Sequence, residues 1–476
     1  MKNLFIILFF IASVFLFSSV SAISKLILFV VLIFIFFINI YIKKFNYTSF
    51  NPTFLIFLVY LFINTFLFSK IPSESKFELL NFLLYGAVFY IFSDLEDINK
   101  DVLHFSFFLV LSIFLMLYIF YKEKAIYFFV YNPNVFSGWC ILVFLFSLVN
   151  IVYSIPSKFV IFLKFNLIAS FVFLILLRNI SGIFVSLIFL NFLFFKKWSL
   201  FLLVLIFGLS LGVVFNFTSI LDRIIWFVVG IKMWVDNPVF GAGLGSFKFG
   251  YPYYSYNLPL SSSATTFVHS YFLHIFVETG IVGGFFLIFF ILSVFIKSFN
   301  FIESRIYLLP ALGILLQNLI DYNLLIPQNS IIFFSFLGLS QRQHIIKENK
   351  ALFIKKIFMI VFLILLGVYN SFYFHKIMIL IRKNDFQKVV NIDKTCWYAY
   401  RKLGEKEFHI RSYKEAEKYF LASLKYNPFD AESYFYLSVI SLKLGQVEWA
   451  YKYLKKAIRL NPKASVRYKK ELEKEI

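Results

Sequence analysis

Apolar positions fill most of this chain of 476 residues, and they occur in continuous runs rather than in strand-like alternation. About thirteen of these runs approach the roughly twenty residues that a membrane-spanning helix needs. The pattern predicts an all-α polytopic membrane protein with about 12–13 transmembrane helices. The predicted spans are 4–20, 23–42, 50–68, 78–92, 104–120, 134–153, 159–177, 180–195, 199–217, 269–296, 303–320, 324–340 and 351–370.

The longest interruption of this pattern covers residues 218–268, between two predicted spans. A chain that is mostly apolar has few places where polar chemistry can occur, and this loop is the largest of them. We therefore predict that residues 1–370 form the membrane domain and that the loop 218–268 holds its functional site.

The remaining residues, 371–476, are rich in charged residues and contain an internal repeat. Leu403 and Leu437, Ala416 and Ala450, and Pro428 and Pro462 are pairs of similar positions, each 34 residues apart. A period of 34 with small alanines and terminal prolines resembles the tetratricopeptide repeat, a helix–turn–helix unit. It predicts repeats over about 397–430 and 431–464 that bind a protein partner; the alternative is a generic amphipathic tail.

The net charge of +21 does not point to nucleic acid, because the basic residues form short clusters between apolar spans rather than one stripe. The positive-inside rule then places the N-terminus in the cytoplasm of a multi-pass inner-membrane protein, and the loop 218–268 and the tail on the extracytoplasmic side. Cys140 and Cys396 have no metal-ligand spacing, and we predict no metal and no cofactor.

A predicted interfacial helix over 219–235 places Arg223 and Trp226 on one face, since they are three residues apart. The planar guanidinium of an arginine matches the oxygens of a phosphate, although an arginine among lipid headgroups is the simpler interpretation. The glycines that follow allow a tight turn whose N–H groups could bind an anion, or they form a plain loop. They are Gly241, Gly243 and Gly245.

His269 opens the next predicted span, and a histidine at a membrane–water boundary can act as a general base. Lys248 adds a cation to the same loop and is predicted to contact substrate. His274 lies off the face of His269 and is predicted to serve in packing.

The ordered set of these motifs resembles the O-antigen ligase/polymerase family of membrane glycosyltransferases. The matching motifs are Arg223, Trp226, Pro238, Gly241-Ala-Gly243, His269-Ser-Tyr, Glu278-Thr-Gly280, an earlier Asn132-Pro-Asn134 and a later Asp321-Tyr-Asn323. The resemblance implies transfer of a glycan from a polyprenyl-diphosphate carrier, with inversion and without a metal. The acceptor would be a lipid A-core, another lipid-linked glycan or a protein, and membrane lipids would surround the site.

The resemblance also implies roles for single residues: Arg223 near the diphosphate, His269 as the base, and Glu278 and Asp321 at the substrate. Two departures from the family pattern stand out. Ser270 replaces the asparagine that follows the family's histidine, and the arginine of a Ser-Arg-Gly element is missing. Arg178 lies three residues before Ser181, on the same predicted helical face, and is a candidate replacement.

Two other classes of function remain open. One is a multi-span transporter of a small anion such as bicarbonate, which broken helices and paired intramembrane charges would favour. The other is an envelope-assembly scaffold that acts through the repeat tail.

Overall fold

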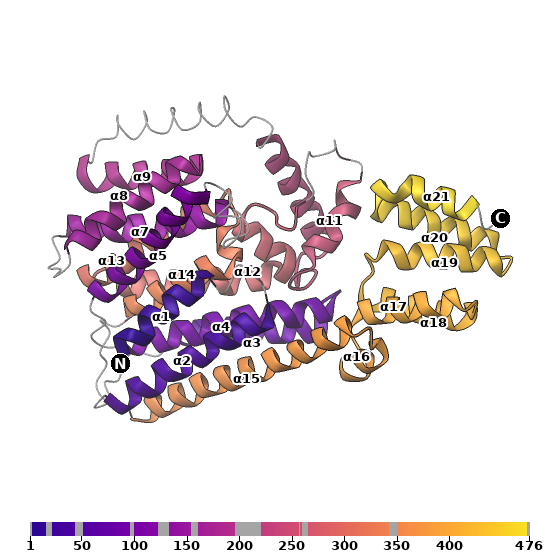
Figure 1. Ribbon diagram of the computed structural model, residues 1–476, viewed down its shortest axis with the longest axis horizontal. Coiled ribbons are helices and arrows are strands. Elements are labelled where there is room, and N and C mark those ends of the chain that lie inside the picture. Colours follow the sequence, from indigo (N-terminus) through magenta and orange to yellow (C-terminus); the bar gives the residue numbers. More distant parts are fainter. Residues whose placement is uncertain are drawn as a thin grey trace. The chain divides into compact units, whose positions relative to one another are not determined.

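The structure is a computed structural model. It describes residues 2–15, 21–42, 51–95, 100–121, 133–153, 160–195, 220–256, 258, 265–341 and 350–473. Every regular element within these residues is a helix (Figure 1), so the predicted all-α class is confirmed. The predicted span 199–217 and Asn132 of the early motif lie outside the described residues.

The chain divides into two compact units, which we describe separately. The first comprises Met1–Leu58, Leu80–Ile220 and Phe286–Phe372. The second comprises Val59–Leu79, Leu221–Phe285 and Tyr373–Ile476, so the tail shares a unit with the central loop.

Several helices are long and apolar enough to cross a membrane, because a continuous apolar helix satisfies its own backbone groups. In the described part of the chain there are six, at Ala22–Tyr41, Pro72–Asp94, Lys100–Tyr121, Val135–Val152, Tyr271–Ser298 and Ile354–Arg382. Shorter apolar helices occupy Lys2–Phe15, Pro52–Phe68, Val160–Leu176 and Ile180–Phe194. Membrane-compatible helices are thus present, while the total of 12–13 spans stays a prediction.

The first unit contains the following helices. They are α1 (Lys2–Phe15), α2 (Ala22–Ile42), α5 (Lys100–Tyr121), α7 (Pro133–Val152), α8 (Val160–Leu176), α9 (Ile180–Leu190), the π-helix η2 (Asn191–Phe195), α13 (Ile302–Gln317), the short η3 (Asn323–Leu325) and α14 (Pro327–Ser340). Within this unit α7 packs on α8 and α13, and every residue of α14 is buried. Asn329 of α14 donates to the carbonyl of Val135 in α7 at 3.0 Å, which ties two buried helices together.

The division between the units falls inside α3 (Pro52–Ile63), α4 (Pro72–Asp94), α12 (Tyr271–Ser298) and α15 (Lys350–Arg382). The second unit also contains the π-helix η1 (Asn64–Phe68), an unlabelled helix over 220–235, and α11 (Phe247–Ser255). Its tail contains α16 (Phe386–Ile392), α17 (Trp397–His409), α18 (Tyr413–Tyr426), α19 (Ala431–Lys443), α20 (Val447–Leu460), the short η5 (Pro462–Ala464) and α21 (Ser465–Glu473).

The tail helices repeat with the predicted period. α19 begins at residue 431, which is 34 after the start of α17 at 397, and α20 likewise follows α18. The equivalent Ala416 and Ala450 are both buried, so the small side chains let the helices of each pair approach closely. An ion pair of 3.1 Å links Arg401 of α17 to Asp430, the residue that directly precedes α19.

Two helices are longer than predicted, in both cases because partners in the second unit support their polar ends. α4 begins at Pro72 rather than at 78, and Ser75 in its first turn donates to the carbonyl of Leu244 at 2.7 Å. α15 continues to Arg382, past the predicted end of its span at 370, because Ile377 is buried in a cluster with Val389 and other tail residues.

Candidate active site

The helix over 220–235 brings Arg223 and Trp226 to the imidazole of His269. The Trp226 indole stacks on this imidazole with 4.0 Å between the ring centroids and an interplanar angle of 27°. Trp226 is 7% exposed and belongs to a buried cluster with Val229 and Met233 of the same helix, which fixes the ring in place. Residues from the two ends of the loop thus meet at one site.

Two donors on this helix lack an acceptor. Nε of Arg223 and Nε1 of Trp226 are buried, and neither has a hydrogen-bond partner among the described residues. A buried donor without an acceptor costs free energy, so such groups are normally satisfied by a partner. An oxygen-rich ligand next to His269 would supply the missing acceptors.

His269 lies two residues before the start of α12 and adopts a left-handed backbone conformation with φ 57°. Burial, and secondly the positive charge of Arg223, lower its pKa from the ordinary 6.5 to about 3. The imidazole is therefore neutral at physiological pH, which is the form that accepts a proton.

Helix α12 is interrupted at its tenth residue. Gly280 has φ 69° and ψ −173°, which is not helical. The loop that carries the glycine cluster docks at this break: the N–H of Ala242 donates to Val277 at 3.0 Å, and the N–H of Gly243 donates to Glu278 at 2.8 Å. In return Pro238 accepts from the N–H of Ile281 at 2.8 Å.

Glycine is required on both sides of this contact. A Cβ on Gly241 would collide with the backbone of Glu278, and a Cβ on Gly280 would collide with the carbonyl of Val239. The N–H of Gly241 also donates within its own turn, to Asn237 at 3.0 Å. In this structure the N–H groups of Gly241 and Gly243 are therefore bonded to backbone carbonyls, and binding of substrate by these glycines stays a prediction.

Glu278 and Lys248 are held by neighbours within the same unit. Oε1 of Glu278 lies 3.2 Å from Nε2 of His274 and accepts the N–H of Phe247 at 3.3 Å. Lys248 pairs with Glu74 of α4 at 2.9 Å. Burial opposes the charged form of Lys248, but the carboxylates of Glu74, Glu78 and Glu278 together outweigh it, and the pKa of the ammonium is raised.

The prediction of a packing role for His274 missed its contact with Glu278, and no signal in the sequence singled out Glu74. Gly245 lies beside Glu74 and Glu78, because a Cβ there would be 3.0 Å from Cγ of Glu78 and 3.6 Å from Cβ of Glu74. His274 lies four residues before Glu278, a spacing that places both on one helical face and could have identified the pair.

Arg178 and Asp321 belong to the first unit. Arg178 is exposed in the turn before α9, with φ 53°, while α9 itself begins at Ile180. The expectation that Arg178 shares a helical face with Ser181 is therefore wrong. Asn179 ends the turn and starts the helix, because its side chain accepts the N–H of Gly182 at 2.6 Å.

Asp321 is buried, at 1% exposure, and Oδ2 accepts a long hydrogen bond of 3.5 Å from Ser181. Gln317 donates to the same serine at 3.2 Å and accepts from Asn323 at 3.0 Å. The late motif and the Ser-Gly element thus form one buried polar network in the first unit. Throughout the described residues, no group of three His, Cys, Asp or Glu side chains is placed to hold a metal ion.

The geometry of the tail agrees with a comparison to known families. Residues 431–464 match the tetratricopeptide repeat family. These are the bounds predicted for the second repeat, and α17 and α18 reproduce the same helix lengths and turn one period earlier. No curated protein matches the chain. Tetratricopeptide repeats commonly present a concave surface to a protein partner.

Proposed function

We propose that the chain is a membrane glycosyltransferase of the O-antigen ligase/polymerase type. It would transfer or polymerise a glycan from a polyprenyl-diphosphate carrier, at the extracytoplasmic face and without a metal. The acceptor is a lipid A-core, a lipid-linked repeat or a protein. The observation that carries the proposal is the pair of buried donors on Arg223 and Trp226, directly beside the neutral His269.

In this proposal Nε of Arg223 binds an oxygen of the carrier diphosphate. His269 takes the proton of the acceptor hydroxyl, whose oxygen attacks the anomeric carbon of the donor sugar. The bond from that carbon to the diphosphate breaks, and its electron pair goes to the leaving oxygen. A cationic donor at the developing charge stabilises this step.

Binding of the diphosphate would also strengthen the base. The charge of Arg223 is one of the two causes of the low pKa of His269. A bound anion offsets that charge and raises the pKa of the imidazole, because a nearby negative charge favours the protonated form. The proton acceptor becomes effective when the donor is in place.

The test is transfer in vitro from a purified lipid-diphosphate glycan, with donor binding measured separately. Arg223→Lys keeps the charge but loses the planar fork, and we expect a hundred- to thousandfold slower transfer. His269→Ala should lose transfer and retain donor binding, and EDTA should have no effect. Matched controls are Lys232→Met on the same helix and His409→Ala in the tail, both exposed. Near-normal transfer by His269→Ala would falsify the mechanism.

One observation bears on the transporter as a second candidate, namely the break in α12 with the buried His274–Glu278 pair beside it. In transporters with broken helices, the unwound backbone groups coordinate the cargo ion. Here the carbonyls of Val277 and Glu278 accept from the glycine loop, and that of Thr279 accepts from Tyr60 at 2.5 Å. Because these carbonyls already accept hydrogen bonds from the protein, they are not free to coordinate a cargo ion. This favours the transferase over the transporter. Uptake of bicarbonate into vesicles containing the protein would reverse this preference.

A further inference from the structure

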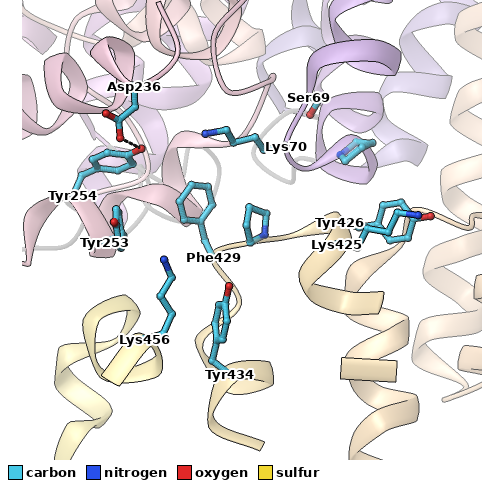
Figure 2. A pocket seen from close by; sticks show the side chains of 12 residues that line it. Ser69, Lys70, Asp236, Tyr253, Tyr254, Lys425, Tyr426, Phe429, Tyr434 and Lys456 are labelled. Atoms are coloured by element: carbon cyan, nitrogen blue, oxygen red, sulfur yellow. Dashed lines mark hydrogen bonds between the residues drawn. The ribbon is translucent and has the colours of Figure 1, made fainter. Parts of the chain in front are cut away.

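The second unit contains a hollow of about 540 Å³ between the turn that joins α18 to α19, the end of α20, α11 and the segment before α4. Figure 2 shows Phe429 of the repeat turn at its centre, with Tyr253 and Lys456 on one side and Lys70 above. None of these residues belongs to the candidate active site. The volume is within the range of sites that bind small molecules or short polymer segments.

The hollow carries an excess of positive charge. Lys70, Lys425 and Lys456 line it, and none of them forms an ion pair or side-chain hydrogen bond within the described residues. Burial lowers the pKa of Lys70, while Asp236 opposes this effect. Asp236 supplies the one carboxylate of the lining and accepts a hydrogen bond of 2.7 Å from Tyr254.

Aromatic rings form much of the remaining wall. They are contributed by Tyr253, Tyr254, Tyr426, Phe429 and Tyr434. Lys456 lies 4.8 Å from the centroid of the Tyr253 ring, so cation and ring face the same space. A tyrosine combines a flat apolar face with a polar hydroxyl, and sugar rings present the same combination of surfaces.

A backbone hydrogen bond connects this wall to the loop of the candidate active site. The N–H of Lys70 donates to the carbonyl of Ala242 at 3.0 Å, and Ala242 is part of the loop that docks at the break in α12. α12 begins two residues after His269. A polymer held in the hollow would therefore contact a segment, at Lys70, that is hydrogen-bonded to the loop docked on α12.

We propose that this hollow binds an anionic saccharide, one whose sugar units bear carboxylate or phosphate groups. The excess of ammonium groups over carboxylates in the lining attracts such anions, and the tyrosine rings stack on the sugar faces between them. The inference rests on the proposed function, in which the saccharide is a segment of the acceptor or of the growing glycan. An acidic peptide would use the ammonium groups but has less need of several tyrosine rings.

The test is binding by the purified full-length protein in detergent, followed by intrinsic fluorescence and by calorimetry. Tetragalacturonate tests the carboxylate and glucose 6-phosphate tests the phosphate, and cellotetraose is the neutral comparison. At least one anionic probe should bind tenfold or more tightly than cellotetraose, and raising the salt should weaken it. Lys70→Met with Lys456→Met should lower this affinity at least tenfold, and Tyr434→Ala should lower it with the charge unchanged.

Lys455→Met is the matched control, because Lys455 precedes Lys456 in the same helix, is exposed and does not line the hollow. Absence of binding by both anionic probes would overturn the inference, as would tighter binding of a glutamate-rich peptide. If inorganic phosphate bound as tightly as the anionic sugars and Tyr434→Ala left its affinity unchanged, the hollow would be a general anion-binding site, and the inference would be overturned. The proposed function fails separately, through transfer and donor binding by the Arg223 and His269 variants.

Discussion

His269 is a neutral imidazole in the folded protein, mainly because it is buried and also because Arg223 is close. Its pKa is about 3 when folded, against an ordinary value of 6.5 that applies to the unfolded chain. Between these values the unfolded chain binds a proton that the folded protein does not. The stability contributed by this residue is therefore complete above pH 6.5 and is lost progressively as the pH falls toward 3.

We predict that His269→Gln makes thermal unfolding less sensitive to acid. Lowering the pH from 7.5 to 4.5 should cost the variant less free energy of unfolding than the parent, by on the order of 1–2 kcal/mol. Melting temperatures of the detergent-solubilised protein at the two pH values measure this. His409→Gln, at an exposed histidine, should leave the difference unchanged. An equal acid sensitivity of parent and His269→Gln would mean that the imidazole is protonated in the folded state.

The sequence was sufficient to choose these residues as candidates but not to predict their contacts in space. Arg223 and Trp226 are three positions apart in a helix, so their shared face follows from helical geometry alone. The stack of Trp226 on His269 joins opposite ends of the loop and depends on how the loop folds. Arg178 shows the opposite case: α9 begins at Ile180, where the predicted span 180–195 begins, and the cap formed by Asn179 leaves Arg178 in the turn before the helix.

At the level of elements, the docking of the glycine loop on broken α12 holds the second unit together around the candidate site. Gly280→Ala should disrupt it, since the new Cβ would meet the carbonyl of Val239 and the backbone conformation is left-handed. We expect a loss of 3 kcal/mol or more, roughly the cost of steric overlap added to backbone strain. Denaturant or thermal unfolding in detergent measures the loss, and transfer should fall with it.

Gly445→Ala separates the cost of backbone strain from the cost of steric overlap. Gly445 also has a positive φ, 73°, but a Cβ there meets nothing within 4 Å. This variant should therefore lose only about 1–2 kcal/mol, the strain of a left-handed alanine. If both variants lose the same amount, the contact between Gly280 and Val239 contributes nothing and the docked arrangement is incorrect.

Elements made by local pattern were predictable, and elements shaped by distant contacts were not. Long apolar runs must be helical in a membrane, and a 34-residue period fixes the register of the tail repeats. The sequence does not single out Gly280 as the break in α12, because Gly283 and Gly284 follow it in the same run and the groups that satisfy the break come from residues 238–243. The early start of α4 likewise depends on partners such as Leu244 and Asp393.

At the scale of the whole molecule, the chain segments that make up the second unit constrain the membrane topology. The unit contains both the central loop and the repeat tail. Contacts inside it include an ion pair of 2.8 Å between Lys76 and Asp393 and the packing of Phe249 against Trp397. Segments in contact through polar groups must share one side of a membrane, and the positive-inside rule predicts the extracytoplasmic side for both.

Single cysteines in a Cys140→Ala, Cys396→Ser background test this orientation. Thr266→Cys in the loop and Lys455→Cys in the tail are exposed and should react with a membrane-impermeant maleimide in intact spheroplasts. Glu303→Cys, exposed in the first turn of α13, should react only after the membrane is opened, because one span separates it from the loop. Labelling of Thr266→Cys and Lys455→Cys on different sides would contradict the shared unit. Labelling of both only after lysis would place the site in the cytoplasm, where the proposed carrier-linked donor has no access to it, and the transferase mechanism would fall with the orientation.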